Sequence, residues 1–451
     1  MKTLSAFKAY DIRGIVPQDL NPELAYDIGR AFASEFNSKQ IVIGYDIRLE
    51  SPGLSEALCN GLMDSGVEII HLGLCGTEEV NFPKSHYQSY GGIMITASHN
   101  PKGYNGMKLV SRGSQPISGD SGLNAIEQRV INKDFRPLAE QKAALQLKED
   151  KSAYIEHLLT YIDVDSLPKF KVVANSGNGS AGPTLDKLAA KLPFNIIKLH
   201  HEADGNFPNS VPNPMIVENR AITSKTIIAE KADFGVAWDG DFDRCFLFDE
   251  NGNFIEGYYL VGLLAETLLK NHPGEKIVHD PRLTWNTIEQ VEQAGGIPVQ
   301  SKTGHAFIKE RMRKEDAIYG GEMSAHHYFK DFAYCDSGMI PWLLIAELMS
   351  KTGKTLSELI KERMKAYPCS GEINYKVTDS QKILAAVQDK YRSENPILDE
   401  TDGLSLEFSD WRMNIRLSNT EPLLRLNIES RGNPGLVAQK VQEIEAIIYA
   451  E

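Results

Sequence analysis

The chain repeats one arrangement of apolar and polar positions three times. A short apolar stretch leads into a polar or glycine-rich turn, then into a segment with the apolar spacing of an amphipathic helix, then into another apolar stretch. The copies lie at 41–73, 171–200 and 276–305. Because strands that alternate with helices of this length form βαβ units, the pattern predicts three related α/β domains.

The C-terminal part of the chain follows a different pattern. Segments of alternating apolar and polar residues lie on either side of a turn at Asp402-Gly403, and a final helix is expected from about Pro434. Alternation of this kind is typical of half-buried strands. The sequence therefore predicts an α/β fold of four domains, in which three are similar and the last is a smaller α+β domain.

Changes in composition indicate where these domains meet. The stretch from Asn132 to Lys151 is rich in Lys, Gln and Glu and is expected to be helical, without strands. Further boundaries are expected near Asn251, after an Asp-Glu-Asn-Gly turn, and near Tyr367-Pro368. The expected domains are 1–142, 143–250, 251–366 and 367–451.

Composition narrows the class of protein. A net charge of −13 argues against a nucleic-acid partner, which needs a basic face, but leaves room for a local cationic pocket. The five cysteines form no Cys-x-x-Cys pair, which indicates a reducing cytoplasm and no structural zinc. The N-terminus has no apolar signal region, and the apolar stretch 338–346, cut short by Glu347, predicts a buried helix too short to span a membrane. We expect a cytoplasmic protein with no membrane contact and no obligate protein partner.

Three carboxylates stand at alternate positions in Asp239-Gly240-Asp241-Phe242-Asp243, so all three could face one cation. Hard oxygen ligands suit Mg²⁺ or Ca²⁺. A calcium loop of the EF-hand type is one alternative, because Glu250 stands at the twelfth position. Against it, Arg244 stands where that loop needs glycine, and the flanks 234–238 and 245–248 have the composition of strands. A solvated acidic turn is a second alternative, and a magnesium site is the interpretation we favour.

The stretch Gly177-Asn178-Gly179-Ser180-Ala181-Gly182 matches the dinucleotide fingerprint G-x-G-x-x-G, and Glu202 lies at a suitable distance beyond it. However, the expected domain is too short to hold a second mononucleotide-binding half. The glycines and Pro183 fit a tight turn from a strand into a helix equally well. We favour a structural turn, and an NAD-dependent oxidoreductase stays open as an alternative function.

Three further loops carry reactive or binding groups. The loop Ile95 to Leu109, "ITASHNPKGYNGMKL", places Ser98 near Lys102 and Lys108, although it could be an ordinary capped turn. The loop 320–327 combines a carboxylate, a hydroxyl and imidazoles that could bind sugar hydroxyls. The turn 416–422, with Arg425 nearby, has the donors of a phosphate clamp, or of a simple salt bridge. Together these loops offer a serine hydroxyl, a cation site, groups that bind sugar hydroxyls and groups that bind phosphate. This combination fits phosphoryl transfer, whose catalysis is mainly positioning and charge stabilisation.

With these motifs the chain resembles the α-D-phosphohexomutase family, the phosphoglucomutases and phosphomannomutases, over nearly its whole length. The resemblance is carried by FKAYDIRG at 7–14, TASHNP at 96–101, DGNFP at 204–208 with PNP at 212–214, DGDFDR at 239–244, KTGH at 302–305, GEMS at 321–324 and RLSNTEP at 416–422. It implies four domains around a central cleft, each of which contributes one loop.

The resemblance also implies a role for each candidate residue. Ser98 would carry the phosphoryl group, and its phosphate would complete the shell of one Mg²⁺ with Asp239, Asp241 and Asp243. A hexose 1,6-bisphosphate would be both intermediate and activator. Arg13, Lys108 and His305 would assist the transfer, and His99 would lie beside the serine. Two cations would line the cleft, Arg244 and Arg282. The sugar would be bound by Glu322, Ser324 and His326, and the phosphate by Arg416, Ser418, Asn419, Thr420 and Arg425.

The segment GEMSAHHYF, with Ala325 where many dual-specificity members have glycine, is similar to bacterial members that act on mannose phosphates. It implies reversible conversion of D-mannose 6-phosphate and D-mannose 1-phosphate, which feeds GDP-mannose synthesis. A dual-specificity mutase and a non-catalytic sugar-phosphate binding protein are the alternatives. Asp46 and Arg48, in a second Tyr-Asp-Ile-Arg motif, are interpreted as structural.

Overall fold

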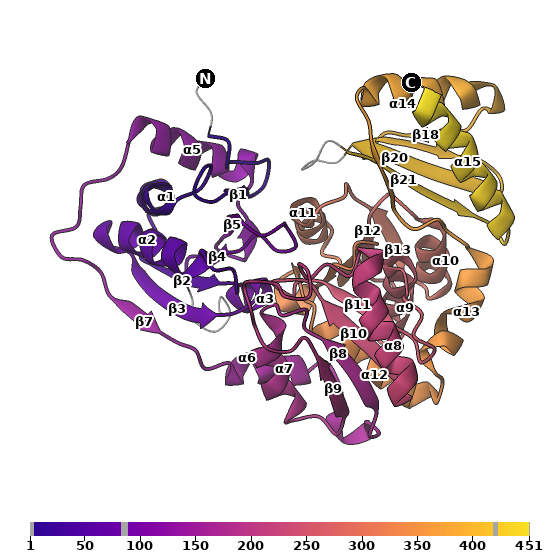
Figure 1. The fold of residues 1–451 in the computed structure, drawn as a ribbon, viewed down its shortest axis with the longest axis horizontal. Coiled ribbons are helices and arrows are strands. Elements are labelled where there is room, and N and C mark those ends of the chain that lie inside the picture. The colour runs from indigo at the N-terminus through magenta and orange to yellow at the C-terminus, as the bar shows by residue number, and fades with distance from the viewer. Residues whose placement is uncertain (1–3, 83–88, 418–422, 451) are drawn as a thin grey trace. The chain divides into compact units, whose positions relative to one another are not determined.

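The computed structural model describes residues 4–82, 89–417 and 423–450. The chain divides into two compact units, Met1–Phe254 with His326–Gly353, and Ile255–Ala325 with Lys354–Glu451. Each unit has its own hydrophobic core, and the elements of both units are labelled in Figure 1.

The first sheet of the first unit has the strand order β1-β5-β4-β2-β3-β7, and β6 pairs with β5. Strands β4, β2, β3 and β7 run parallel to one another, whereas β5 runs antiparallel to both β4 and β1. Its elements are β1 Ile12–Ile15, α1 Pro22–Phe36, β2 Gln40–Tyr45, α2 Ser51–Asp64, β3 Glu68–Leu74, α3 Thr77–Asn81, β4 Gly92–Ile95, β5 Tyr104–Ser111, β6 Gln115–Pro116, α5 Leu123–Asn132 and β7 Leu145–Leu147.

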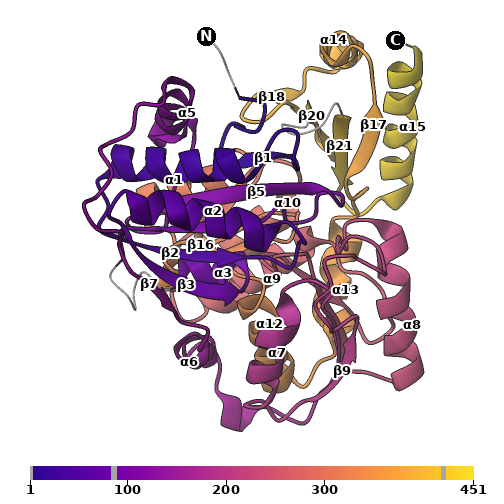
Figure 2. The same ribbon diagram turned by 60° about the vertical axis from the view of Figure 1, so that its left-hand side comes forward.

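This sheet is buried on both faces, which is why its central strands are almost wholly apolar. Ile41 and Ile43 of β2 pack into the cluster that includes residues of α1, α2 and α5, whereas Val42 packs on the opposite face with Val80 of α3. The two faces follow from the two-residue period of a strand. Helices α1 and α2 lie side by side along the sheet (Figures 1 and 2).

The second sheet of this unit has the order β11-β10-β8-β9, with β11 antiparallel to β10 and the rest parallel. Residues 239–244, which carry the three aspartates and are called the metal loop below, lie between β10 and β11. The elements are α6 Ser152–Leu159, β8 Lys171–Asn175, α7 Ala181–Ala189, β9 Asn195–Leu199, α8 Ala221–Glu230, β10 Phe234–Trp238, β11 Cys245–Phe248, α12 Ile340–Thr352, and the hairpin β15 His327–Phe329 with β16 Cys335–Asp336.

One local expectation was wrong. The stretch 132–151 is not helical throughout: α5 ends at Asn132, and β7 pairs with β3. Main-chain hydrogen bonds to β3 cover a sheet edge whatever the side chains are, so composition does not reveal such a strand. The buried helix expected around 338–346 is confirmed as α12, which continues past Glu347 to Thr352. The Glu347 carboxylate accepts a hydrogen bond from the Asp163 amide and pairs with Lys351, so it does not end the helix.

The second unit contains a parallel set of strands in the order β13-β12-β14 and a five-stranded antiparallel sheet in the order β17-β21-β20-β19-β18. Elements around the parallel strands are α9 Gly257–Leu269, β12 Lys276–His279, α10 Trp285–Gln293, β13 Ile297–Gln300, α11 His305–Glu315, β14 Tyr319–Gly321 and α13 Leu356–Ala366. Those of the antiparallel part are β17 Ile373–Lys376, α14 Ser380–Tyr391, β18 Ile397–Asp399, β19 Leu404–Glu407, β20 Trp411–Leu417, β21 Leu423–Ser430 and α15 Pro434–Ala450.

The fold class agrees with the prediction from sequence. Helices α14 and α15 pack on the antiparallel sheet through one apolar cluster, which gives the expected α+β domain (Figure 1). The final helix begins at Pro434 as expected, and Gly403 has a φ of 75° in the turn between β18 and β19. Within the described ranges, none of the helices has the length and apolarity needed to cross a bilayer.

Candidate active site

Ser98 lies in the loop between β4 and β5, residues 96–103, which is called the serine loop below. The side chain of Ser98 is buried. Its backbone is left-handed, with a φ of 47°, a conformation that non-glycine residues rarely adopt. The Thr96 hydroxyl accepts a hydrogen bond from the Ser98 amide at 2.7 Å and so fixes the turn. Ser98 Oγ donates to Asp239 Oδ2 at 2.7 Å and lies 3.0 Å from His99 Nδ1. The loop therefore presents its hydroxyl directly to the metal loop.

The three aspartates of the metal loop are buried, with exposed fractions of 0% for Asp239, 0% for Asp241 and 2% for Asp243. One oxygen from each lies within 4.8 Å of the others. The Oδ1 atoms of all three are buried and accept no hydrogen bond from the described residues. Such a donor set fits a hard divalent cation. The burial contradicts a solvated acidic turn, and the flanking strands β10 and β11 contradict an EF-hand, which needs helices there.

Lys108 on β5 offsets much of this negative charge. Its Nζ donates to Asp241 Oδ2 at 2.7 Å and to Asp243 Oδ2 at 2.6 Å. Burial alone would lower the pKa of Lys108, but the two carboxylates raise it far above the usual value, so the side chain stays an ammonium. Burial opposes the ionisation of Asp241 too, and Lys108 nevertheless holds the pKa of Asp241 below its usual value. Burial and the neighbouring charge of Asp241 raise the pKa of Asp243.

Arg244 compensates the third carboxylate. Its Nε and Nη2 atoms donate to Asp239 Oδ2 at 2.8 and 2.6 Å, and Nη2 also contacts His99 Nδ1. Burial, followed by the charge of Arg244, lowers the pKa of His99 well below its usual value. His99 is therefore neutral, and because its Nδ1 faces a guanidinium donor, its ring proton is on Nε2.

Arg13 and His326 lie around the same centre. Arg13 donates to Asp11 Oδ2 at 2.7 Å and to Asn100 Oδ1 at 2.6 Å. His326 Nδ1 lies 3.1 Å from Asp336 Oδ2 and 4.0 Å from Asp243 Oδ1. In the first unit the structure thus brings Ser98, His99, Lys108, Arg244, His326 and the three aspartates together. Lys102 is not among them, because it is exposed and contacts Asn206.

Residues of the second unit form a separate network around Arg282. Its guanidinium pairs with Asp280 at 2.6 Å and donates to Ser324 Oγ at 3.2 Å. Glu322 Oε1 lies 3.5 Å away and also accepts a hydrogen bond from the amide of Gly304 at 2.8 Å. That amide precedes His305, the first residue of α11. The predicted sugar-binding residues Glu322 and Ser324 are therefore adjacent to Arg282 and His305.

Arg416 and Arg425 converge on one carboxylate that sequence reasoning missed. Glu372 lies 3.1 Å from Arg416, 3.3 Å from Arg425 and 3.4 Å from Arg282. Burial alone would raise the pKa of Glu372, but the three guanidinium groups lower it. The charge of Arg282 is already paired with Asp280, so Arg416 and Arg425 share Glu372 as their common carboxylate. The predicted phosphate-binding residues Ser418, Asn419 and Thr420 lie outside the described residues.

Thr77 and Asp336 are two other contacts that the sequence did not reveal. Thr77, at the first position of α3, donates through its hydroxyl to Asp241 Oδ2 at 2.6 Å, and its amide donates to the Asp241 carbonyl at 3.1 Å. Asp336 orients His326. Neither residue belongs to a recognisable motif. Their contacts arise because segments far apart in the chain fold together, and only Gly76, which leaves no room for a Cβ beside the Phe242 ring, hints at the close approach.

The glycines of the turn 177–182 are explained by packing. A Cβ on Gly179 would lie 2.9 Å from the Gly240 carbonyl oxygen, and one on Gly182 would lie 2.3 Å from the His201 carbonyl oxygen. The Ser180 amide donates to that same Gly240 carbonyl at 3.0 Å. The turn therefore supports the metal loop from behind, and the structural interpretation accounts for the motif.

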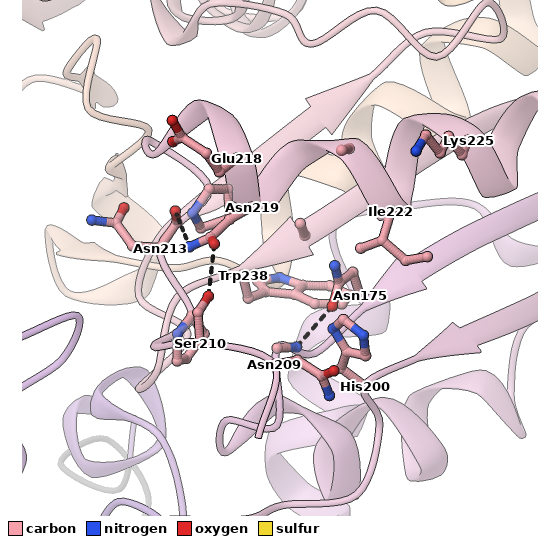
Figure 3. A pocket seen from close by; sticks show the side chains of 15 residues that line it. Asn175, His200, Asn209, Ser210, Asn213, Glu218, Asn219, Ile222, Lys225 and Trp238 are labelled. Carbon is pink, nitrogen blue, oxygen red and sulfur yellow. Dashed lines mark hydrogen bonds between the residues drawn. The ribbon is translucent and has the colours of Figure 1, made fainter. Parts of the chain in front are cut away.

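A cavity of about 380 Å³ lies beside this turn (Figure 3). Its polar lining is largely engaged internally: Asn219 contacts Ser210 and the Asn213 carbonyl, and Asn175 accepts a hydrogen bond from the Gly177 amide (Figure 3). These contacts hold the loop 209–214 against η3 (Val217–Arg220), at the start of α8. We therefore assign these lining residues to holding the loop 209–214 in place, and we assign no ligand to the cavity.

Four family models match successive parts of the chain. Three are described as Phosphoglucomutase/phosphomannomutase, alpha/beta/alpha domains I, II and III, and match residues 4–137, 152–252 and 256–367. The fourth, described as the C-terminal domain of the same family, matches 372–447. The chain belongs to this family.

Relatives of known name support the same placement in the phosphoglucomutase/phosphomannomutase family. A protein of Xanthomonas campestris named "Phosphohexose mutases" is 58% identical over 99% of each chain. A "Phosphomannomutase" of Escherichia coli K12 is 54% identical over 99% of this chain and 100% of its own. A solved family member from Burkholderia thailandensis is 29% identical, with a TM-score of 0.89 over 100% of this chain and 98% of that one.

We predict that Lys108→Met destabilises the protein when divalent cations are chelated. The change leaves three buried carboxylates without the shared ammonium, and breaking a buried ion pair in this way costs about 3–5 kcal/mol. Added Mg²⁺ should raise the melting temperature of the variant more than that of the wild type, because a bound cation replaces the missing charge. Calorimetric melting at pH 8 with chelator and with Mg²⁺ measures both effects.

Lys102→Met is the matched control, because Lys102 is an exposed residue of the same loop. Its melting temperature should stay close to that of the wild type in both buffers. Equal melting temperatures for Lys108→Met and Lys102→Met would show that Lys108 does not balance the carboxylates.

Proposed function

We propose that this protein is a phosphomannomutase, which interconverts D-mannose 6-phosphate and D-mannose 1-phosphate through a phosphoserine and a hexose 1,6-bisphosphate. The observation that carries the proposal is the contact between Ser98 Oγ and Asp239 Oδ2, at 2.7 Å, within a group of three buried carboxylates. A serine beside a divalent-cation site, in a member of this mutase family, is the arrangement that phosphoryl transfer from an enzyme residue requires.

The first transfer moves a phosphoryl group from Ser98 Oγ to the free hydroxyl of the bound sugar phosphate. The bond between phosphorus and Ser98 Oγ breaks, and a bond from phosphorus to the sugar oxygen forms. The sugar hydroxyl loses a proton, and Ser98 Oγ gains one as it leaves. Asp239, Asp241 and Asp243 would hold one Mg²⁺, which when bound offsets the charge of the phosphoryl oxygens. Lys108 and Arg244 add positive charge near Ser98. Because Lys108 stays protonated, we assign it to charge stabilisation and assign the acceptance of the hydroxyl proton to His305.

The second transfer returns the other phosphate to Ser98. The bisphosphate must reorient between the two steps, so the groups that hold its far end must accept either phosphate. We assign this task to Arg282, Arg416 and Arg425, with Ser418, Asn419 and Thr420. Glu322, Ser324 and His326 would bind sugar hydroxyls, and Arg13 would steady the serine loop through Asn100. Free hexose 1,6-bisphosphate would act as activator by restoring phosphoserine.

We propose domain boundaries at 142/143, 250/251 and 366/367. The family matches leave gaps at 138–151, 253–255 and 368–371, so the first boundary lies within a gap and the other two lie within two residues of one. A cytoplasmic location without an obligate protein partner is also proposed; the five cysteines, all free, support a reducing compartment. A dual-specificity mutase is the second candidate, because one close relative carries the broader name "Phosphohexose mutases".

We expect Ser98→Ala to lower mutase activity on the order of a thousandfold or more, because the residue that carries the phosphoryl group is removed. Peptide mapping of active wild-type protein should find phosphate on Ser98. Ser111→Ala, in the same β-strand region but outside these contacts, should keep wild-type activity. Phosphate on another residue, or full activity in Ser98→Ala, would exclude the mechanism. Absence of turnover in the wild type would favour a sugar-phosphate binding protein.

Activity should require Mg²⁺ and should fall strongly in Asp241→Asn, because a hard cation depends on the number and charge of its oxygen ligands. Titration of activity with Mg²⁺ after chelation measures the change as a higher Mg²⁺ requirement. Asp233→Asn, at the start of β10 and away from the metal loop, is the control. Undiminished turnover of chelated wild-type protein would refute the metal assignment.

The mannose phosphates should be preferred over the glucose phosphates. The two sugars differ only at the 2-hydroxyl, and one such difference is worth about 10–200-fold in kcat/KM. The supporting feature is the GEMSAHHYF segment with Ala325. The measurement is kcat/KM for both 1-phosphates with a hexose bisphosphate present. Equal or glucose-favouring values would leave the mutase proposal intact and support dual specificity.

A further inference from the structure

The carbonyl groups of the serine loop converge on one buried guanidinium. Arg48 Nη2 donates to the carbonyl oxygens of Ser98, at 2.8 Å, and Asn100, at 2.5 Å. Arg48 Nη1 donates to those of Pro101 and Tyr104, both at 2.9 Å. All four terminal N–H bonds of the guanidinium are therefore used by a single seven-residue stretch. The side chain is only 2% exposed, so water does not compete for these bonds.

Arg48 is itself held rigidly at the end of β2. Asp46 Oδ1 accepts hydrogen bonds from the Arg48 amide at 3.0 Å and from the Ser51 hydroxyl at 2.6 Å, and Asp46 Oδ2 lies 3.5 Å from Arg48 Nε. The Asp46 amide donates to the carbonyl of Ile95, the last residue of β4, at 2.9 Å. The guanidinium is thus tied to the same sheet from which the serine loop leaves.

The DGNFP segment covers this contact from the other side. The Phe207 ring centroid lies 5.3 Å from the Arg48 guanidinium carbon, and a Cβ on Gly205 would lie 2.4 Å from the Ile47 carbonyl oxygen. Phe207 is buried and has a φ of 51°, a strained conformation that its surroundings must enforce. The segment therefore shields the Arg48 guanidinium from water, a role that its sequence alone did not indicate.

We propose that Arg48 is the positioning residue of the serine loop: it holds Ser98 in its left-handed conformation through backbone carbonyls, without contacting Ser98 Oγ or the substrate. The inference rests on the proposed function of Ser98. Both transfers use the same oxygen, so a small displacement of the loop slows both, and a misplacement of about 1 Å costs roughly 100-fold in rate. The rate of transfer should therefore depend on Arg48, while substrate affinity should not.

The conservative variant Arg48→Lys tests this. An ammonium has three donors around one nitrogen and cannot span four carbonyls as the planar fork does. We expect kcat to fall about 100-fold, with KM for mannose 1-phosphate changed less than threefold, in both reaction directions. Arg112→Lys is the control and should match the wild type, because Arg112 is exposed and lies directly after β5, the strand that follows the serine loop.

Chemical rescue separates positioning from folding. In Arg48→Ala, methylguanidinium should restore part of kcat, whereas methylammonium should not, because only the former presents a fork of N–H donors. Unchanged kcat in folded Arg48→Lys overturns the proposal. A loss of activity that merely follows the unfolded fraction at the assay temperature, with no rescue of Arg48→Ala, overturns it as well.

A readout on the loop itself is independent of catalysis. The amides of Ser98, Asn100 and Tyr104 are hydrogen-bonded within the loop, so their hydrogen exchange reports its order. Exchange in a peptide covering 96–104 should rise in Arg48→Lys and stay unchanged in Arg112→Lys. If the wild type turned over no hexose phosphate, the proposed function would fail while this measurement still tested whether Arg48 orders the loop. Unchanged exchange would overturn the inference whatever the activity.

Discussion

The dominant constraint on this protein is the repulsion among three buried carboxylates on one short turn. Asp239, Asp241 and Asp243 lie within 4.8 Å of one another, where like charges in a low-dielectric interior oppose ionisation. The surrounding structure offsets that repulsion with Lys108 and Arg244, which come from different parts of the chain. The same arrangement brings Ser98 to the carboxylates, since its loop and Lys108 share the hairpin β4–β5. The hairpin β4–β5 therefore both compensates the charge of the carboxylates and places Ser98 beside them.

Backbone geometry then fixes what electrostatics has brought together. Glycines at 76, 179 and 240 allow backbones to approach closely around the metal loop, and Ser98 adopts a left-handed conformation opposite Gly240. The strained backbone of Ser98 persists because hydrogen bonds to its amide and to its carbonyl enforce it. Such rigidity suits the proposed mechanism, because rigid groups need not reorganise at each transfer.

In the second unit, too, like charges lie close together because a group of opposite charge lies among them. Arg282, Arg416 and Arg425 would repel one another if no carboxylate lay among them, and Glu372 contacts all three. Arg282 also reaches Ser324 and Glu322, so the groups proposed to bind sugar hydroxyls and phosphate belong to one network. Fixed guanidinium groups bind phosphate oxygens with little loss of entropy.

The sequence by itself determined the repeated α/β pattern, the α+β end, the flanking strands of the metal loop and the identity of the residues able to do chemistry. These are local properties, because strand and helix periods, turn residues and functional groups are visible in a short window. Composition did not predict β7, because main-chain pairing at a sheet edge does not depend on the side chains. Only the tertiary structure decided the partners: Thr77 for Asp241, Asp336 for His326, Glu372 for the arginines and Arg48 for the serine loop. Such contacts join residues tens to hundreds of positions apart, and their geometry depends on packing that no local pattern encodes.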